Sequence, residues 1–192
     1  MDLNTIFNTL GTWTIGSLTA IDLLAATTNA FNGAILASRP DHRRNWTTVG
    51  IILIAVIGGI GGGVTRDVLL NVIPSAFTNP WYLILCLAAA ALALAATKRL
   101  SGHGIRRTFD FMAAFSLPWY AIIGTQKALA DDLPVLAVVL IGVVGPTAGR
   151  YFIDLTSGVT PQHFTRGEWF VGTAVLTSVT YIILYALGLA TP

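Results

Sequence analysis

Two arginines lie deep inside apolar stretches of this chain, and each follows a cluster of residues that weaken helices. Arg66 follows the glycine-rich run 58–63, and Arg150 follows the run 142–149, which contains glycines and a proline. A charge at the centre of a bilayer costs about 2.5–3.5 kcal/mol on insertion scales, so such residues normally face protein or a water-filled cavity. Non-helical backbone is tolerated at that depth only where protein or a cavity covers it. The two patterns together indicate a route for a polar solute through a membrane.

The glycine clusters predict backbone carbonyls that are available to a cation. Each glycine weakens a helix by about 1 kcal/mol relative to alanine, so we expect both runs to unwind or kink. Pro146 has no N–H and therefore frees the carbonyl of Gly142. The predicted pathway residues are Gly58, Gly61, Gly62, Gly63, Thr65, Gly142, Gly145, Pro146 and Thr147. Close helix packing is the alternative role for these small residues.

Each arginine has a carboxylate close to it in the sequence. Asp154 follows Arg150 by four residues, which places both on one face of a helix. Asp67 adjoins Arg66 and is not expected to face the same way on a regular helix. A helix N-terminus created by a break would favour its carboxylate. These pairs either line or gate a pathway, or only lock helices together, and both interpretations stay open.

Lys127 ends an apolar stretch and is a candidate for a movable charge at the mouth of the pathway. The alternative is a lysine that reaches to the membrane interface along its own stem. Asp131 and Asp132 follow directly. They either concentrate cations at this mouth or are ordinary solvated loop acids.

The composition excludes a water-soluble globule. Of the 192 residues, 54% are hydrophobic and only 10% are charged, against about 25% charged in soluble domains. The net charge of +2 gives no indication of a nucleic-acid partner. The three histidines lie far apart in polar connections without metal-ligand spacing, and the sequence shows no catalytic constellation. We therefore expect neither an enzyme nor a cofactor.

Six segments are apolar enough to cross a membrane, for which about 20 residues are needed. The predicted fold is an all-α polytopic membrane helix bundle that forms a single domain over residues 1–192. The predicted spans are 16–38, 46–72, 80–97, 109–130, 133–155 and 167–190.

Basic residues in alternate loops predict the orientation of these spans. Arg39, Arg43 and Arg44 follow the first span, the basic residues at 98–107 follow the third, and Arg166 follows the fifth. By the positive-inside rule these loops are cytoplasmic and the N-terminus is outside. We expect a multi-pass protein of a prokaryotic plasma membrane, surrounded by lipids. Trp46, Trp81, Tyr82 and Trp169 are predicted to anchor the span ends at the interfaces.

Two halves of the chain repeat one pattern. Asp22 corresponds to Asp110, and Arg39 corresponds to Lys127 at the same offset. Each half has three spans, so the second half is expected to be inverted relative to the first. The first repeat covers residues 16–97 and the second, inverted repeat covers 109–190.

The run 61–70, followed by Pro74, resembles the GGGxxRD signature of the prokaryotic TRIC (trimeric intracellular cation) channels. It equally resembles a related bacterial inner-membrane family, some members of which are linked to glycine transport. The stretches 110–127 and 164–170 are similar to the same superfamily. The second copy departs from the signature, because Tyr151 stands where the first copy has Asp67.

The resemblance implies a homotrimer with one pore inside each protomer, lined by kinked second and fifth spans. It implies passage of potassium, with sodium as a second candidate, and no metal other than the transient ion. A gating lysine in the fourth span maps to Lys127. Members of the family usually have a seventh span, for which this chain offers no segment after the second repeat.

The function expected on this basis is a potassium-permeable channel for monovalent cations. The alternative is a secondary carrier for glycine or another small zwitterion, because the ends of broken helices can bind a carboxylate and an ammonium group. A helix-bundle scaffold without a pore is the third interpretation, and it leaves the intramembrane arginines unexplained.

Overall fold

The computed structural model describes residues 17–38, 46–97, 102–158, 160–161 and 169–190, and the regular structure in these residues is entirely helical. The predicted all-α bundle is therefore confirmed. The helices in chain order are α2 (Ser17–Ala37), α3 (Thr48–Leu69), α4 (Ser75–Thr78), α5 (Trp81–Thr97), α6 (Gly102–Ala130), α7 (Val135–Ser157) and α8 (Phe170–Ala186).

Local sequence signals set several of the helix ends. The side chain of Thr47 accepts a hydrogen bond from the backbone N–H of Gly50 and so caps the start of α3. Pro134 precedes α7. Its missing N–H costs no hydrogen bond there, because the N–H groups at the start of a helix have no partner within the helix. Gly158 ends α7 in the left-handed conformation at a φ of 68°, which glycine adopts without steric cost.

The long helices agree with the predicted spans. Residues 20–37, α3 and α7 are long and apolar enough to cross a membrane, while α5 and α8 are shorter apolar helices of 17 residues each. Helix α6 begins at Gly102, earlier than the predicted start at 109, because a helix can continue past the apolar part of its sequence. The basic loop residues 39–45, 98–101 and 162–168 lie outside the described residues.

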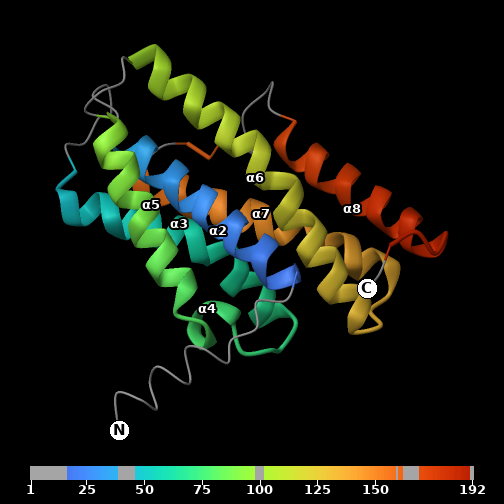
Figure 1. The fold of residues 1–192 in the computed structure, drawn as a ribbon. Coiled ribbons are helices and arrows are strands. Elements are labelled where there is room, and N and C mark those ends of the chain that lie inside the picture. The colour runs from blue at the N-terminus through green and yellow to red at the C-terminus, as the bar shows by residue number, and fades with distance from the viewer. Residues whose placement is uncertain (1–16, 39–45, 98–101, 159, 162–168, 191–192) are drawn as a thin grey trace, which may run out of the picture.

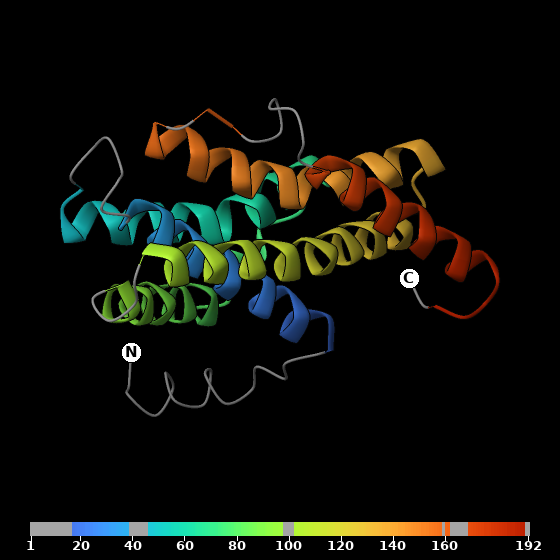
Figure 2. The same ribbon diagram turned by 90° about the horizontal axis from the view of Figure 1, so that it is seen from above.

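Helix α2 occupies the centre of the bundle. It packs against α3, α5 and α6, as Figures 1 and 2 show. Helix α5 covers one edge, against α2 and α3, and α8 covers the opposite edge, against α6 and α7 (Figure 1). The first three long helices therefore contact one another in the same scheme as the last three.

Helices α3 and α7 run antiparallel and touch through their glycines. Gly62 lies against the backbone of Gly145, and Gly58 lies against the side chain of Ile153. Both helices are continuous through their glycine clusters, α7 even through Pro146, so the predicted unwinding is wrong. Each glycine lets a neighbouring element approach closely, and this packing offsets the low helix propensity of the sequence.

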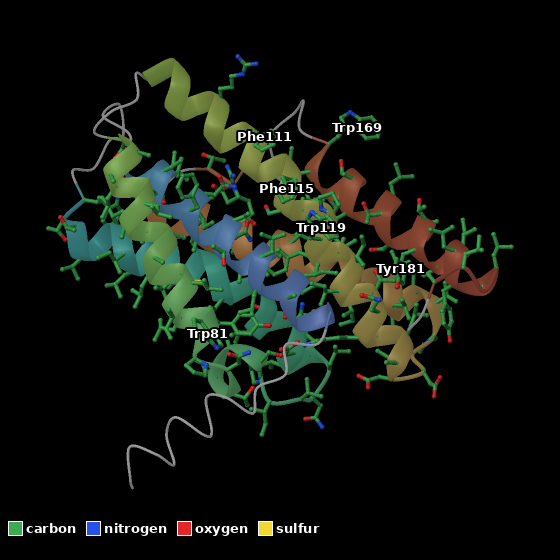
Figure 3. All side chains as sticks on the ribbon, viewed as in Figure 1. Trp81, Phe111, Phe115, Trp119, Trp169 and Tyr181 are labelled. Carbon is green, nitrogen blue, oxygen red and sulfur yellow. The ribbon has the colours of Figure 1, made fainter. Side chains whose placement is uncertain are left out.

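Two tryptophans mark the opposite ends of the bundle. Figure 3 shows Trp81 at the start of α5 and Trp169 before α8, at opposite ends of the molecule. Trp169 is largely exposed and Trp81 is partly exposed. Both positions suit interface anchors at the two membrane surfaces.

Candidate functional site

A buried arginine joins two helices at the end of the bundle where α2 begins and α3 ends. The guanidinium of Arg66 is 0% exposed and donates from both Nη atoms to the carboxylate of Asp22, at 3.1 and 2.9 Å. Its Nε also donates to Asp67 Oδ1 at 2.9 Å. The fork of the guanidinium therefore links α2 to α3 and holds two carboxylates at once.

Asp67 collects hydrogen bonds from three parts of the chain. Oδ1 accepts from Arg66 and from Nζ of Lys127, the latter at 2.9 Å. Oδ2 accepts from the backbone N–H and the hydroxyl of Ser75, at 3.0 and 3.2 Å. Ser75 begins the short helix α4. Asp67 thus ties α3, α4 and α6 together at one end of the bundle.

Lys127 reaches into the protein rather than lying freely at the interface. Its side chain is 27% exposed, and Nζ contacts both Asp67 and the hydroxyl of Ser75. The structure therefore brings the predicted gating lysine onto a predicted pathway carboxylate. An amine that keeps partial access to solvent can leave this contact at a lower cost than a fully buried one.

Tyr82 completes the cluster and corrects a prediction. Its hydroxyl donates to Asp22 Oδ2 at 2.8 Å, and the residue is only 4% exposed. It is therefore not an interface anchor, because its polar end is used inside the bundle. We call Asp22, Arg66, Asp67, Ser75, Tyr82 and Lys127 the outer charge cluster, after the predicted orientation.

The predicted pair of the second half is present. Arg150 Nε donates to Asp154 Oδ1 at 3.0 Å, four residues along α7, and both side chains are buried. Tyr151 is more than a third exposed and lies beside Phe152, so it points out of the bundle and not into a pathway. The residue that follows the arginine therefore faces protein in α3, where it is Asp67, and the surface in α7, where it is Tyr151. The side chain of Asp110 is outside the described part of the structure.

Polar groups also lie between the two charged pairs. The hydroxyl of Tyr120 donates to the backbone carbonyl of Gly59 at 2.5 Å. The hydroxyl of Ser116 donates to Asn29 Oδ1 at 3.2 Å. The amide of Asn29 reaches the α3–α7 contact, since its Nδ2 lies 3.1 Å from the position of a Cβ on Gly149. These groups extend a column of hydrogen-bonding atoms into the interior of the bundle.

A small cavity lies beneath the outer charge cluster. It has room for about one water molecule. Its walls include both carboxylates of the cluster, Arg66, Tyr82, Gly59 and Tyr120. The cavity therefore connects the charged end of the column with the Tyr120–Gly59 hydrogen bond.

Most of the predicted pathway glycines serve as helix contacts in this conformation. Gly61 lies against Phe152, and Gly142 lies against the hydroxyls of Thr125 and Ser178. Gly145 lies near Tyr120, whereas Gly63 borders the cavity and has open space around it. The close-packing alternative thus describes these glycines here, with α3 and α7 in direct contact.

The predicted threonines hydrogen-bond within their own helices. Thr65 Oγ1 donates to the carbonyl of Gly61 at 2.8 Å, and Thr147 Oγ1 donates to the carbonyl of Val143 at 2.7 Å. Pro146 is fully buried. The backbones of Thr65, Thr147 and Pro146 lie beside the contact of α3 with α7. A separation of these two helices would expose them.

Several residues of the site were not predicted from the sequence. Asp22 was predicted only as one member of a repeated pair. It is the only charged residue of its predicted span, and such an acid indicates a basic partner on another span. Asn29 carried a similar signal, as an amide inside a predicted membrane span, and the structure buries it. The remaining residues that were missed are Ser75, Tyr82 and Tyr120, whose roles depend on contacts between distant segments.

A family model and proteins of similar sequence match most of this chain. A family model described as glycine transporter matches residues 8–98 and 110–186. A membrane protein of Deinococcus radiodurans, described as UPF0126, is 27% identical over 86% of this chain and 75% of its own length.

Solved structures show a similar fold. The TRIC trimeric intracellular cation channel orthologue from Rhodobacter sphaeroides is 25% identical, with a TM-score of 0.80 over 89% of this chain and 85% of that one. A prokaryotic TRIC channel crystallised in KCl is 20% identical, with a TM-score of 0.81 over 88% of this chain and 84% of that one. The resemblance to TRIC channels that the sequence indicated is confirmed.

Proposed function

This chain is a multi-pass membrane protein of the glycine transporter family, and we propose that it forms a potassium-permeable channel for monovalent cations, with a pore inside each protomer. The observation that carries the proposal is the contact of Lys127 with Asp67 at 2.9 Å. An ammonium group that keeps partial access to solvent there binds a carboxylate at the end of an interior polar column. The likeness to a cation channel over most of both chains supports the same function.

The charges of the outer cluster explain how such a contact could gate cations. With Lys127 in place, the cluster combines two carboxylates, Asp22 and Asp67, with two cations, Arg66 and Lys127. When Lys127 leaves, one negative charge is uncompensated in a site with low-dielectric walls. Such a site concentrates cations and repels anions. Arg66 stays behind, because its bidentate contact with Asp22 is fully buried.

The proposed pathway continues between α3 and α7. It would be lined by the glycines and threonines predicted from the sequence, after the two helices separate at the contact of Gly62 with Gly145. The carbonyl of Gly142, whose helical N–H donor is missing because of Pro146, would then replace part of the ion's water shell. Arg150 and Asp154 would hold the far end of the pathway in place.

The assembly and orientation are part of the same proposal. We propose a homotrimer in the prokaryotic plasma membrane, with the outer charge cluster on the external side and the two halves inverted. The antiparallel contact of α3 with α7 supports the inversion, because these helices hold equivalent places in the two halves. Lipids would surround the exposed apolar side chains of the outer helices.

Recordings in planar bilayers test the channel. Purified protein is reconstituted under a potassium chloride gradient, as wild type and as Lys127→Gln. We expect discrete currents that reverse near the potassium equilibrium potential, and a higher open probability for Lys127→Gln. Arg107→Gln is the matched control, since Arg107 is an exposed cation on the same helix, far from Asp67. Folded, inserted protein that stays silent in all forms would contradict the proposal.

A carrier for glycine or another small zwitterion is the second candidate, because the matching family model bears that description. The outer charge cluster offers carboxylates for an ammonium group and Arg66 for a carboxylate. Proteoliposomes loaded with glycine separate the two functions. A carrier takes up labelled glycine by counterflow and saturates, whereas a channel gives ion currents without counterflow.

Cysteine accessibility tests whether the predicted threonines line the pathway. Thr65→Cys and Thr147→Cys are made in a Cys86→Ala background, since Cys86 is the single cysteine of the chain. We expect a hydrophilic thiol reagent to label both positions, and to do so faster when Lys127→Gln is added. Protection of both positions in every background would favour a scaffold without a pore.

A further inference from the structure

Tyr120 is a buried phenol whose hydroxyl is directed at the backbone of another helix. The residue lies on α6, is 1% exposed, and donates to the carbonyl oxygen of Gly59 on α3 at 2.5 Å. Gly59 lies within the continuous helix α3, where its carbonyl is positioned to accept a helical hydrogen bond. A carbonyl oxygen has two lone pairs, so the phenol takes the second acceptor site of this oxygen.

The position of this hydrogen bond places it on the proposed pathway. Gly59 and Tyr120 both line the cavity beneath the outer charge cluster. On its other side, the ring of Tyr120 lies beside the α3–α7 contact, with Cδ1 at 3.9 Å from the position of a Cβ on Gly145. Tyr120 therefore stands between the cavity and the contact that must open.

We propose that the carbonyl oxygen of Gly59 is a cation-binding position and that the hydroxyl of Tyr120 occupies it in this conformation. Tyr120 is then a second closure, in series with Lys127 and deeper in the membrane. This inference rests on the proposed channel function. The hydroxyl proton takes the place of the cation on the carbonyl, and its withdrawal leaves an oxygen ligand beside a cavity of about the size of one water molecule.

The ligand class follows from the chemistry of this position. The cavity wall holds Asp22 and Asp67, and Arg66 binds both, so no more than one negative charge is uncompensated when Lys127 leaves, and the other ligands are neutral oxygens. Neutral carbonyl and phenol oxygens suit a weakly hydrated monovalent cation such as potassium. A divalent cation would demand more negative charge than the single uncompensated carboxylate supplies here.

The competing explanation is that the hydrogen bond only satisfies a buried phenol. In that case its removal lowers stability and leaves currents unchanged. The two explanations therefore differ in a measurable quantity, the current through protein that is folded.

The test compares Tyr120→Phe with Tyr181→Phe, both in the Lys127→Gln background. Tyr181 is the matched control, because its hydroxyl also has a hydrogen-bond partner, accepting from Nε2 of Gln126 at 2.6 Å. Tyr181 lies on α8 (Figure 3) and does not line the cavity. We expect Tyr120→Phe to raise the open probability about fivefold, the factor that corresponds to one hydrogen bond of typical strength. Tyr181→Phe should leave the open probability unchanged. Thermal unfolding in detergent shows which variants are folded.

Each outcome separates this inference from the channel function. If Lys127→Gln conducts and Tyr120→Phe, folded, conducts equally, Tyr120 only packs and this inference fails alone. If Tyr120→Phe does not fold, Tyr120→Leu also removes the hydroxyl and is judged by the same readout. If folded wild type and Lys127→Gln are both silent, the channel function fails and this inference fails with it.

Discussion

The two halves of the molecule build a similar three-helix junction from different side chains. In the first half, Gly59 of α3 meets the thiol of Cys86 on α5 and Ala26 and Ala30 of α2. In the second half, Gly142 of α7 meets the hydroxyls of Ser178 on α8 and Thr125 on α6. A glycine thus lets three helices converge in both halves, but the surrounding atoms are mainly apolar in one and polar in the other.

The polar groups of the two halves are consequently placed at different depths. The first half concentrates charge at the end of the bundle where α2 begins, where Asp22, Arg66 and Asp67 meet Lys127 from the second half. The second half has hydroxyls at its junction, where the hydroxyl of Ser178 is buried and has no hydrogen-bond partner among the described residues. The comparison teaches that a shared helix arrangement fixes where helices meet, and not what chemistry is found there.

Removal of either buried arginine should produce the largest effects, and their order tests the difference between the halves. Arg66→Ala removes a binding partner from two acids, Asp22 and Asp67. Arg150→Ala removes a partner from one acid, Asp154. Breaking a buried ion pair costs about 3–5 kcal/mol. We expect Arg66→Ala to destabilise more than Arg150→Ala, measured by thermal unfolding in detergent. Equal and small losses would show that the charges are hydrated and not structural.

Substitution of neighbouring glycines in α3 should separate packing from propensity. A Cβ on Gly62 collides with the backbone of Gly145, which cannot turn aside, so Gly62→Ala should cost several kcal/mol, of the order of an overpacked core. Gly63→Ala is the matched control, since Arg66 Nη2 at 3.8 Å is the only close neighbour of such a Cβ among the described residues. That change should be neutral or stabilising by up to about 1 kcal/mol. Unfolding curves of the two variants should therefore shift in opposite directions.

Double substitutions at the two junctions sharpen the comparison directly. The methyl group of Gly142→Ala would collide with the side-chain oxygens of Ser178 and Thr125. Adding Ser178→Ala should therefore recover part of the lost free energy of unfolding. Gly59→Ala meets Cys86 Sγ at 2.6 Å but also the backbone oxygen of Ala26 at 2.9 Å.

Adding Cys86→Ala to Gly59→Ala should therefore recover little, because the backbone of Ala26 remains in place. The coupling free energies from the two double-mutant cycles, typically 0.5–3 kcal/mol for residues in contact, measure this difference. A coupling at Gly59 as large as the one at Gly142 would contradict the distinction between the junctions.

The smallest effects are expected at two threonines, one in each half. Thr65→Val and Thr147→Val remove only a hydroxyl that bonds back to its own helix. Such bonds add little to helix stability, so each change should alter the free energy of unfolding by less than about 0.5 kcal/mol. A larger loss at one of them would reveal a contact to another helix in the membrane-embedded protein.

The positions of the long helices were predictable because length and apolar composition are local properties of the sequence. The Arg150–Asp154 pair was also predictable, since four residues along a helix bring two side chains to one face. The pairing of Arg66 with Asp22 was not, because the two lie 44 residues apart and meet only through the packing of α2 on α3. The expectation that Asp67 faces away from Arg66 was wrong for a related reason: the guanidinium is long enough to reach sideways along its own helix.

Two further predictions failed where tertiary contacts override local preference. Glycine propensity predicted unwound or kinked segments in α3 and α7, but contacts such as Gly62 against Gly145 keep both helices continuous, so neither is unwound. Tyr82 has the composition and position of an interface anchor, and only the neighbouring Asp22 explains why its hydroxyl is buried. In both cases the deciding partner lies on another helix, which a local pattern does not contain.

The four charges at positions 22, 66, 67 and 127 also constrain how this protein can evolve. They sum to zero within a site where three of them are almost fully buried. A single replacement that removes one charge strands its partner in the bilayer, whereas a paired replacement of an acid and a base keeps the balance. Among relatives, these positions should therefore change as a group, and a member that lacks the lysine should also lack one of the two acids.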